Sequence, residues 1–521
     1  MNKLSLREKI GQLIVTGFPG PEITDDLNQL ITEYKIGNII LFSHNVRSVD
    51  QLSRLCTELQ ERITEQTGQP AFISIDQEGG RVTRLPDEAT NVPGAMAIAS
   101  TGRPENAYAA GRITARELRA LGINFNLAPV LDINNNKQNP VINVRSYGDT
   151  AYTVEEYGLQ MLRGLQEGGV LASIKHFPGH GDTAVDSHLG LPVIDKSVEQ
   201  LEELELKPFR RAIEYGAECI TTAHILFPSV EKEQIPATMS KTIITDLLKQ
   251  KLGYSGLVIS DCLEMEAIQK FYGTAKGAVG AIKAGVHMVF VSHTPKLVIE
   301  AVHQLEQAVL SGELPMEIVN EAVEKVMYYK NKYAGASQTE QDLSIVGCAA
   351  HRRSAEEISL ESICHVRGEL KIVEPGEPGT IFIGSYPYRS DMASSSVNHS
   401  FSFPETMGQA FNTAHLLIDI NPAEHEIHEI IEQVKSYFHI IIGLYNGREN
   451  QGQLKLVHRL KELGANVTAV ALGRPYDLEL LGDDVCGLAA FEYTPLAVKS
   501  IISILKGSVK PSGRMSIAFG N

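Results

Sequence analysis

Ionisable side chains are concentrated in one stretch, Lys175–His188. It holds a lysine, three histidines and two aspartates, together with Pro178, Gly179 and Gly181. It follows an apolar run, Val170–Ile174, that is typical of a buried strand, and its glycines and proline predict a loop. An imidazole with an ordinary pKa can donate and accept protons near neutral pH, and a loop on a rigid scaffold can aim it. We therefore interpret this stretch as a site of acid–base chemistry rather than a solvated surface loop.

Polar residues also end several other apolar runs. They fall at the ends of the third to seventh runs along the chain: Asp76, Asp132, Lys175 with His176, His224 and Asp261. One such residue would mean little, because every strand must end. Five in succession favour a shared polar pocket. Asp132 is the weakest member, because the neighbouring Asn134–Asn136 is typical of a plain turn.

Alternating strands and helices must position these residues. Amphipathic segments such as Val198–Tyr215 and Lys241–Lys251 separate the apolar runs, which indicates parallel β/α units. Eight such units within about 300 residues predict a closed (β/α)8 TIM-type barrel, with its active site at the carboxyl ends of the strands. The predicted strands are Gln12–Gly17, Gly37–Phe42, Ala71–Asp76, Phe125–Asp132, Val170–Ile174, Cys219–His224, Gly256–Asp261 and His287–Val291.

A second α/β pattern follows the barrel. We expect a barrel domain at residues 1–335, a linker at 336–365 and an α/β/α sandwich at 366–521. The second pattern contains neither a P-loop nor a strand-placed G-x-G-x-x-G. Its apolar runs are Thr380–Gly384, Ala414–Asp419, His439–Leu444 and Asn466–Leu472.

Composition excludes several classes of protein. The net charge of −16 argues against nucleic acid or an anionic membrane as the main partner. The six scattered cysteines lack C-x-x-C spacing, which argues against a zinc cluster and a disulfide framework. No apolar run approaches about 20 residues, and the first nine residues lack the apolar segment of a signal peptide. A cytoplasmic protein is the expectation.

The stretch Lys175–His188 closely resembles the signature loop of glycoside hydrolase family 3, in its β-N-acetylglucosaminidase branch. Further resemblance lies in Ile75–Arg84, in Arg145–Asp149, in Ser260-Asp261 with the following Leu-Glu-Met, and in Pro511–Arg514. The resemblance covers nearly the whole chain. It implies a barrel followed by an α/β/α sandwich, and a retaining exo-hydrolase that acts on terminal β-linked N-acetylglucosamine without a metal or other cofactor.

The resemblance also implies roles for individual residues. Asp261 would be the nucleophile, and His188, held by Asp186, would be the proton donor. A retaining glycosidase needs one group of each kind. The sugar would be bound by Asp76, Arg84, Arg145, Lys175 and His176.

Several alternatives stay open. Asp261 would also suit a helix cap, and Lys175 and Arg145 could pair structurally with nearby acids. His180 and Asp182 are expected to shape the loop, but with His176 and His188 they could instead hold zinc. Cys262 is expected to be a buried apolar residue rather than a reactive thiol.

The function itself has alternatives. A histidine proton donor avoids placing a second carboxylate beside an incoming phosphate. Phosphate could therefore replace water, which would make the protein a phosphorylase. A non-catalytic sugar-binding protein is a third possibility, which the combination of Asp186, His188 and Asp261 disfavours. The substrate is expected to be a small carbohydrate, either a muropeptide fragment from cell-wall recycling or a chitin oligomer.

Overall fold

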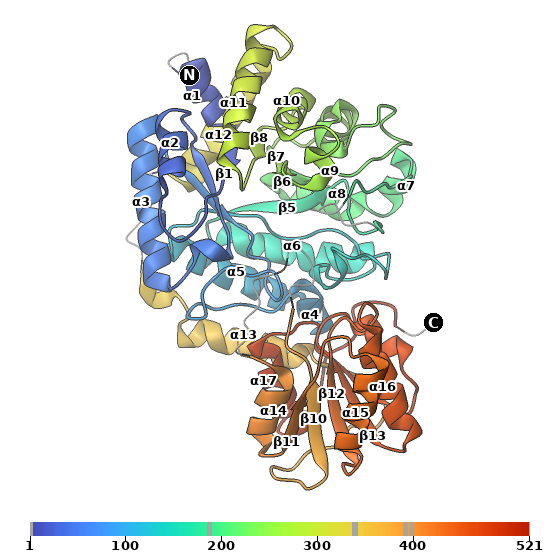
Figure 1. Cartoon of the computed structure of the whole chain (residues 1–521). Coiled ribbons are helices and arrows are strands. Elements are labelled where there is room, and N and C mark those ends of the chain that lie inside the picture. The colour runs from blue at the N-terminus through green and yellow to red at the C-terminus, as the bar shows by residue number, and fades with distance from the viewer. Residues whose placement is uncertain (1–3, 185–189, 336–341, 389–393, 395–400, 520–521) are drawn as a thin grey trace.

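The computed structural model describes residues 4–184, 190–335, 342–388, 394 and 401–519. Its chain forms two bodies (Figure 1), a barrel followed by an open sheet with helices on both faces. The barrel comes first, in blue to yellow, and the second body, in orange to red, lies against one side of it.

Eight parallel strands close the barrel in chain order, which confirms the predicted (β/α)8 fold. Each predicted run overlaps one strand, and the side chains of the barrel interior belong to one continuous apolar core. The strands are β1 (Ile14–Thr16), β2 (Asn38–Leu41), β3 (Phe72–Ile75), β4 (Phe125–Asn126), β5 (Leu171–Phe177), β6 (Cys219–Thr222), β7 (Leu257–Cys262) and β8 (Met288–Phe290).

The largest differences from the predicted bounds are in β4 and β5. β4 ends at Asn126 rather than Asp132, because Pro129 has no N–H to donate to a ladder. β5 continues through Lys175 and His176 to Phe177, although ionisable residues usually end a buried strand. The site residues on β5 are therefore held by the barrel itself.

Helices surround the barrel. The predicted helix Val198–Tyr215 is two helices, because Leu204 leaves helical geometry. Residues Thr242–Lys251 form a π-helical segment. The α-helices are α1 (Leu6–Gly11), α2 (Asp25–Thr32), α3 (Val49–Thr67), α4 (Ala95–Ser100), α5 (Pro104–Ala120), α6 (Ala151–Glu167), α7 (Val198–Glu203), α8 (Leu206–Tyr215), α9 (Glu266–Gln269), α10 (Thr274–Ala284), α11 (Pro295–Leu310) and α12 (Met316–Tyr333).

The second body is a six-stranded sheet in the order β11-β10-β12-β13-β14-β9. All pairs are parallel except β9 with β14. Its strands are β9 (Cys364–Arg367), β10 (Thr380–Gly384), β11 (Ala414–Leu417), β12 (His439–Leu444), β13 (Asn466–Ala471) and β14 (Cys486–Ala489). Its helices are α14 (Phe403–Phe411), α15 (Glu424–Val434), α16 (Gln451–Glu462) and α17 (Pro495–Leu505). Another helix, α13 (Ala349–Ser362), lies within the stretch predicted to be a linker.

Side-chain alternation in β12 explains the sandwich. Ile440, Ile442 and Leu444 belong to the apolar cluster under α15 and α16, whereas Ile441 belongs to the cluster under α14 and α17. Successive side chains of a strand point to opposite faces, so a strand that is apolar throughout needs helices on both.

Direct contacts join the two bodies. The Asn134 amide donates to the Tyr476 hydroxyl at 2.9 Å, and Lys137 pairs with Glu479 at 2.8 Å. Met96 from α4 packs in the apolar cluster of the second body. Asn134 and Lys137 both lie in the loop after β4, so the second body contacts the end of the barrel that carries the predicted site.

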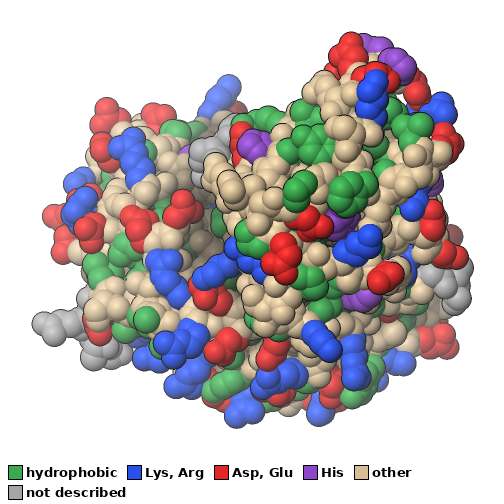
Figure 2. Space-filling view, turned by 90° about the horizontal axis from the view of Figure 1, so that it is seen from below, with side chains coloured by type: hydrophobic (Ala, Val, Ile, Leu, Met, Phe, Trp, Pro, Cys, Tyr) green, Lys and Arg blue, Asp and Glu red, His purple; other side chains and the backbone are tan. Residues whose placement is uncertain are grey.

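The surface carries mixed charge. Figure 2 shows acidic and basic side chains interspersed over one face. Among the described residues, no helix has the length and apolar character needed to cross a membrane.

Candidate active site

Six of the eight predicted site residues line one cavity of about 540 Å³ at the carboxyl ends of the barrel strands. Asp186 and His188 lie outside the described residues. The six residues come from β5, β7 and the loops that follow β3 and β4: Asp76, Arg84, Arg145, Lys175, His176 and Asp261. Of the residues expected to share a pocket at the strand ends, Asp76, Lys175, His176 and Asp261 line this cavity, whereas Asp132 and His224 are buried and are not among its lining residues.

An ion network joins four side chains of the cavity. Arg145 donates to both carboxylate oxygens of Glu78, from Nη2 to Oε1 at 2.7 Å and from Nε to Oε2 at 2.9 Å. Lys175 Nζ lies 2.7 Å from Glu78 Oε1 and 2.8 Å from Asp76 Oδ1. Only 7% of the Glu78 side chain is exposed, against 22% of that of Asp76. Both carboxylates line the cavity, Asp76 as the more exposed one and Glu78 as the buried partner of both cations.

Burial and charge act in opposite directions on this network. Burial alone would raise the pKa of Glu78, but the charges of Arg145 and Lys175 hold it well below its ordinary value. Burial would likewise lower the pKa of Lys175, and the charges of Asp76 and Glu78 raise it instead. Both groups stay charged at neutral pH. Arg145 and Lys175 therefore do pair with acids, as the structural alternative expects, while also lining the cavity.

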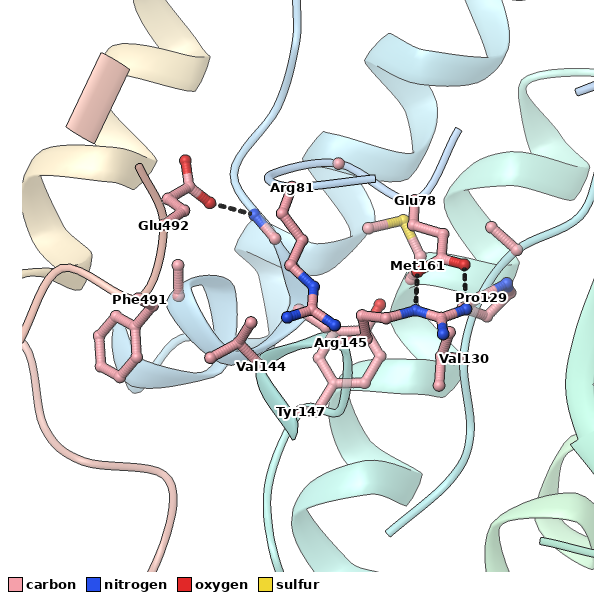
Figure 3. Close-up of a pocket in the computed structure, with 15 residues that line it drawn as sticks. Glu78, Arg81, Pro129, Val130, Val144, Arg145, Tyr147, Met161, Phe491 and Glu492 are labelled. Atoms are coloured by element: carbon pink, nitrogen blue, oxygen red, sulfur yellow. Dashed lines mark hydrogen bonds and ion pairs between the residues drawn. The ribbon is translucent and has the colours of Figure 1, made fainter. Parts of the chain in front are cut away.

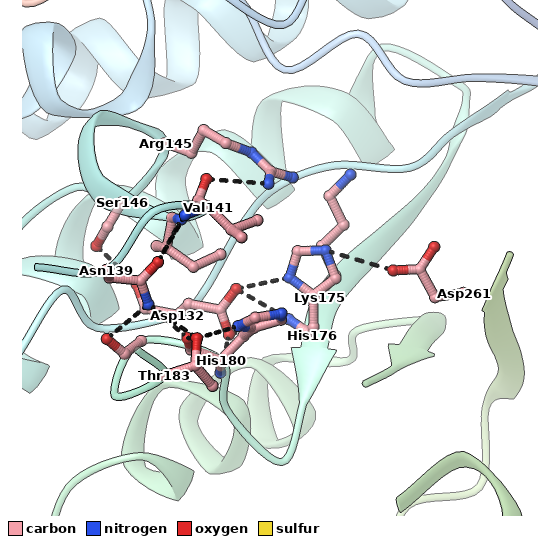
Figure 4. Close-up of polar contacts among 12 residues, drawn as sticks. Asp132, Asn139, Val141, Arg145, Ser146, Lys175, His176, His180, Thr183 and Asp261 are labelled. Carbon is pink, nitrogen blue, oxygen red and sulfur yellow. Dashed lines mark hydrogen bonds and ion pairs between the residues drawn. The ribbon is translucent and has the colours of Figure 1, made fainter. Parts of the chain in front are cut away.

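Asp132 is fully buried and makes hydrogen bonds with two histidines (Figure 4). Its Oδ2 atom lies 2.7 Å from His176 Nδ1, and its Oδ1 atom accepts from the His180 backbone N–H at 2.7 Å. Burial would raise the pKa of Asp132, but its interactions with His176 and the hydrogen bond from the His180 backbone hold that pKa below its ordinary value. Burial and the neighbouring His176 lower the pKa of His180 to about 4, so its imidazole is neutral. Asp132 is thus a central support, not a plain turn residue.

Asp261 projects from β7 into the cavity, with 31% of its side chain exposed. Its Oδ1 atom accepts from the Cys262 backbone N–H at 2.7 Å, and its Oδ2 atom lies 3.9 Å from His176 Nε2. The next helix, α9, has Met265 at its N-cap. Asp261 therefore caps no helix among the described elements, and its carboxylate faces the space beside the predicted sugar-binding residues.

The described part of the Lys175–His188 loop is fixed by close packing. A Cβ atom on Gly181 would lie 1.6 Å from the carbonyl oxygen of Ile133, so only glycine fits there. Asp182 pairs with Lys196 at 2.6 Å, and Lys196 also pairs with Glu205. Asp182 therefore shapes the loop, as expected, but through a lysine side chain rather than through the loop backbone.

The thiol alternative has little support, whereas the zinc alternative needs His188, which lies outside the described residues. Burial raises the pKa of Cys262 to about 12, so its thiol stays protonated and weakly nucleophilic. Within the described part of the chain, no group of three or more histidine, cysteine, aspartate or glutamate side chains could hold a metal ion.

The sequence interpretation missed several residues of the cavity. Glu78 went unnoticed, although two predicted cations, Arg145 and Lys175, required more carboxylate charge than Asp76 supplies. Phe42, His44 and His293 were missed because they follow the second and eighth strands, whereas the polar strand ends recognised in the sequence belong to the third to seventh. Ser394 was missed because it belongs to the second body and reaches the barrel cavity from there.

A smaller cavity of about 20 Å³ lies behind this site, at the contact with the second body (Figure 3). Glu78 and Arg145 line both cavities. From the second body, Glu492 accepts a hydrogen bond from the Gly94 backbone N–H at 2.8 Å. Burial raises the pKa of Glu492 to about 7. A buried carboxyl group of the second body thus lines the small cavity together with Glu78 and Arg145 of the ion network.

A closed (β/α)8 barrel with a cavity at its strand ends, lined by carboxylates, cations and imidazoles, is typical of a TIM-barrel enzyme. The sequence model described as the glycosyl hydrolase family 3 N terminal domain matches residues 5–328. The chain therefore belongs to glycosyl hydrolase family 3, and its class of enzyme is glycoside hydrolase, as the resemblance predicts.

Individual proteins agree with this assignment. The structure of a glycoside hydrolase family 3 beta-N-acetylglucosaminidase from Paenibacillus sp. str. FPU-7 is 38% identical, with a TM-score of 0.93 over 99% of both chains. Beta-hexosaminidase A from Pseudoalteromonas piscicida is 35% identical over 66% of this chain and 61% of its own length. Beta-hexosaminidase from Thiobacillus denitrificans is 33% identical over 55% of this chain and 80% of its own length.

Proposed function

We propose that this chain is a retaining exo-β-N-acetylglucosaminidase. The observation that carries the proposal is the position of Asp261, whose carboxylate stands in the cavity 3.9 Å from His176 and beside the ion network. The names of the similar proteins support N-acetylglucosamine as the sugar.

The described residues suggest how the sugar is held. Asp76 can accept a hydrogen bond from a sugar hydroxyl while Lys175 donates to it or to its neighbour. Such charge-assisted hydrogen bonds are stronger than neutral ones. Glu78 keeps Arg145 and Lys175 in place, so the polar groups are oriented before the sugar arrives.

In the proposed reaction Asp261 attacks the anomeric carbon and forms a covalent glycosyl ester. His188, oriented by Asp186, gives its proton to the leaving oxygen and then removes a proton from the attacking water. These two roles rest on the sequence alone. The substrate would be a small carbohydrate with a terminal β-linked N-acetylglucosamine, from a muropeptide or from chitin.

Release of nitrophenol from an aryl β-N-acetylglucosaminide tests the activity. A slow fluorinated N-acetylglucosaminide should label the peptide that contains Asp261, as detected by mass spectrometry. Asp261→Asn should abolish both the turnover and the label. Labelling of another peptide, or full activity of Asp261→Asn, would reject the mechanism.

The same assay with added phosphate addresses the phosphorylase alternative. A hydrolase should yield free N-acetylglucosamine at an unchanged rate. A sugar 1-phosphate product would instead identify phosphate as the acceptor.

A further inference from the structure

Three aromatic rings line the active-site cavity from the ends of strands that carry none of the ion network. Phe42 and His44 follow β2, and His293 follows β8. The rings of Phe42 and His293 are 4.8 Å apart, and those of Phe42 and His44 are 5.6 Å apart and stacked at 23°. Both histidines are exposed and Phe42 is half-buried. We refer to these three residues as the ring wall.

Hydrogen bonds hold the ring wall in place. His44 Nε2 lies 2.9 Å from the Phe18 carbonyl oxygen, which can only accept, so Nε2 carries a proton. Glu264 accepts from the backbone N–H groups of His293 at 2.7 Å and Thr294 at 3.1 Å. The His44 ring and the backbone of His293 are thus already held before a ligand binds, which lowers the entropic cost of binding.

Asp261 lines the same cavity as the ion network and the ring wall. On one side its carboxylate approaches His176. On the other, Glu264, three residues along the chain from Asp261, holds the loop that carries His293. A sugar bound to the ion network with its anomeric carbon at Asp261 would direct its leaving group away from that network, toward the remaining wall.

We propose that the ring wall is the binding surface for the leaving part of the substrate, and that it takes a neutral sugar ring. The inference rests on the proposed function. Flat aromatic faces match the C–H faces of a pyranose, as is common in pockets that combine aromatic walls with a few polar groups.

The acidic residues near the ring wall favour a neutral leaving group over an anionic one. Among the described residues that line the cavity, the charged groups on β7 and in the loop after it are Asp261, Glu264 and Glu266, all acidic. The cations Arg84, Arg145 and Lys175 belong to the β3–β5 side. A leaving group with a carboxylate would face three like charges, whereas an uncharged aminosugar ring would not. The wall therefore favours chitin oligomers over carboxylate-bearing wall fragments.

Three substrates separate the effect of ring stacking from the effect of charge. The leaving group of methyl β-N-acetylglucosaminide has no ring, and that of chitobiose is a neutral ring. In N-acetylglucosamine linked to muramic acid, the leaving ring bears a carboxylate. In Phe42→Ala and in His293→Ala, the ratio of kcat/KM for chitobiose to that for the methyl glycoside should fall about two- to tenfold, as expected for loss of one ring contact. Glu266→Gln should raise the ratio of kcat/KM for the muramic acid substrate to that for chitobiose.

Phe438→Ala is the matched control, because Phe438 is an exposed phenylalanine of the second body that does not line the cavity. It should leave both ratios unchanged. Thermal melting checks that each variant is folded, and the exposed His293 offers a variant that leaves the core intact. Unchanged ratios in folded Phe42→Ala and His293→Ala, or a wild-type preference for the muramic acid substrate, would overturn the inference. If wild-type protein cleaves none of the three substrates, the proposed function itself fails.

Discussion

The Nδ1 atom of His176 lies 2.7 Å from the Oδ2 atom of the buried Asp132. A carboxylate oxygen can only accept, so Nδ1 carries a proton and the Nε2 atom of His176 is turned toward Asp261. One buried aspartate thereby sets both the tautomer and the direction of the imidazole beside the proposed nucleophile.

Asp132→Asn should therefore lower both stability and activity. The substitution replaces a charge-assisted hydrogen bond by a neutral one, which should lower the free energy of unfolding by about 1.5–3 kcal/mol. Urea unfolding measures this change, and kcat/KM on an aryl N-acetylglucosaminide should fall as the imidazole loses its orientation.

Thr183→Val is the control for this experiment. Thr183 contacts His180 Nδ1 at 2.9 Å but leaves the Asp132–His176 pair intact. Equal losses of activity in the two variants would argue that Asp132 acts only by packing the loop.

Glu78→Gln should strongly destabilise the protein, because Arg145 and Lys175 would remain charged and buried without their shared carboxylate. Removing one partner of a buried ion pair typically costs about 3–5 kcal/mol. Glu479→Gln removes the more exposed pair with Lys137 and should cost at most about 1 kcal/mol. Chemical denaturation of both variants at neutral pH tests the difference.

The pH dependence gives a second test of Glu78. Because its pKa is lowered in the folded state, its stabilising contribution is complete above the ordinary carboxyl value of about 4.3 and is lost as pH falls below it. The stability gap between wild type and Glu78→Gln should therefore shrink between about pH 5 and pH 3. A gap that stays constant over this range would contradict the account.

Sequence patterns predicted the barrel well because strand and helix periodicity is local. They failed where a distant partner decides the outcome. Lys175 and His176 end an apolar run in the sequence, yet both lie inside β5 because Asp76, Glu78 and Asp132 compensate their charge and polarity. Those partners come from other strand ends, which only the closed barrel brings together. The edge strand β9 was missed because its residues Cys364–Arg367 are largely polar and only partly buried, so they form no apolar run.

The second body should make stability depend on pH through Glu492. Its folded pKa is raised to about 7, so the folded state binds a proton that the unfolded state releases near pH 4.3. The contribution of Glu492 to stability should therefore fall by about 3 kcal/mol as pH rises from about 4.5 to about 7. Glu492 accepts from both the Gly94 N–H and the Thr494 hydroxyl; Glu492→Gln keeps the acceptor for Gly94, presents an amide N–H to the Thr494 oxygen and does not titrate. Relative to wild type, the variant should gain stability over this pH range in thermal melts, and parallel curves would exclude the effect.

His188 is proposed to be the proton donor to the glycosidic oxygen beside Asp261. A sugar leaving group needs that proton, whereas dinitrophenolate departs without it, so His188→Ala should lose about a hundred- to ten-thousandfold in rate on chitobiose and far less on a dinitrophenyl glycoside. The same imidazole must then activate water, so added azide, which needs no deprotonation, should accelerate the variant and give a glycosyl azide. Asp186→Asn should show a weaker form of the same pattern, because it leaves the imidazole present but poorly oriented. If His188→Ala slows every substrate by one common factor and azide has no effect, then the histidine is structural and the proton donor is another group of the cavity.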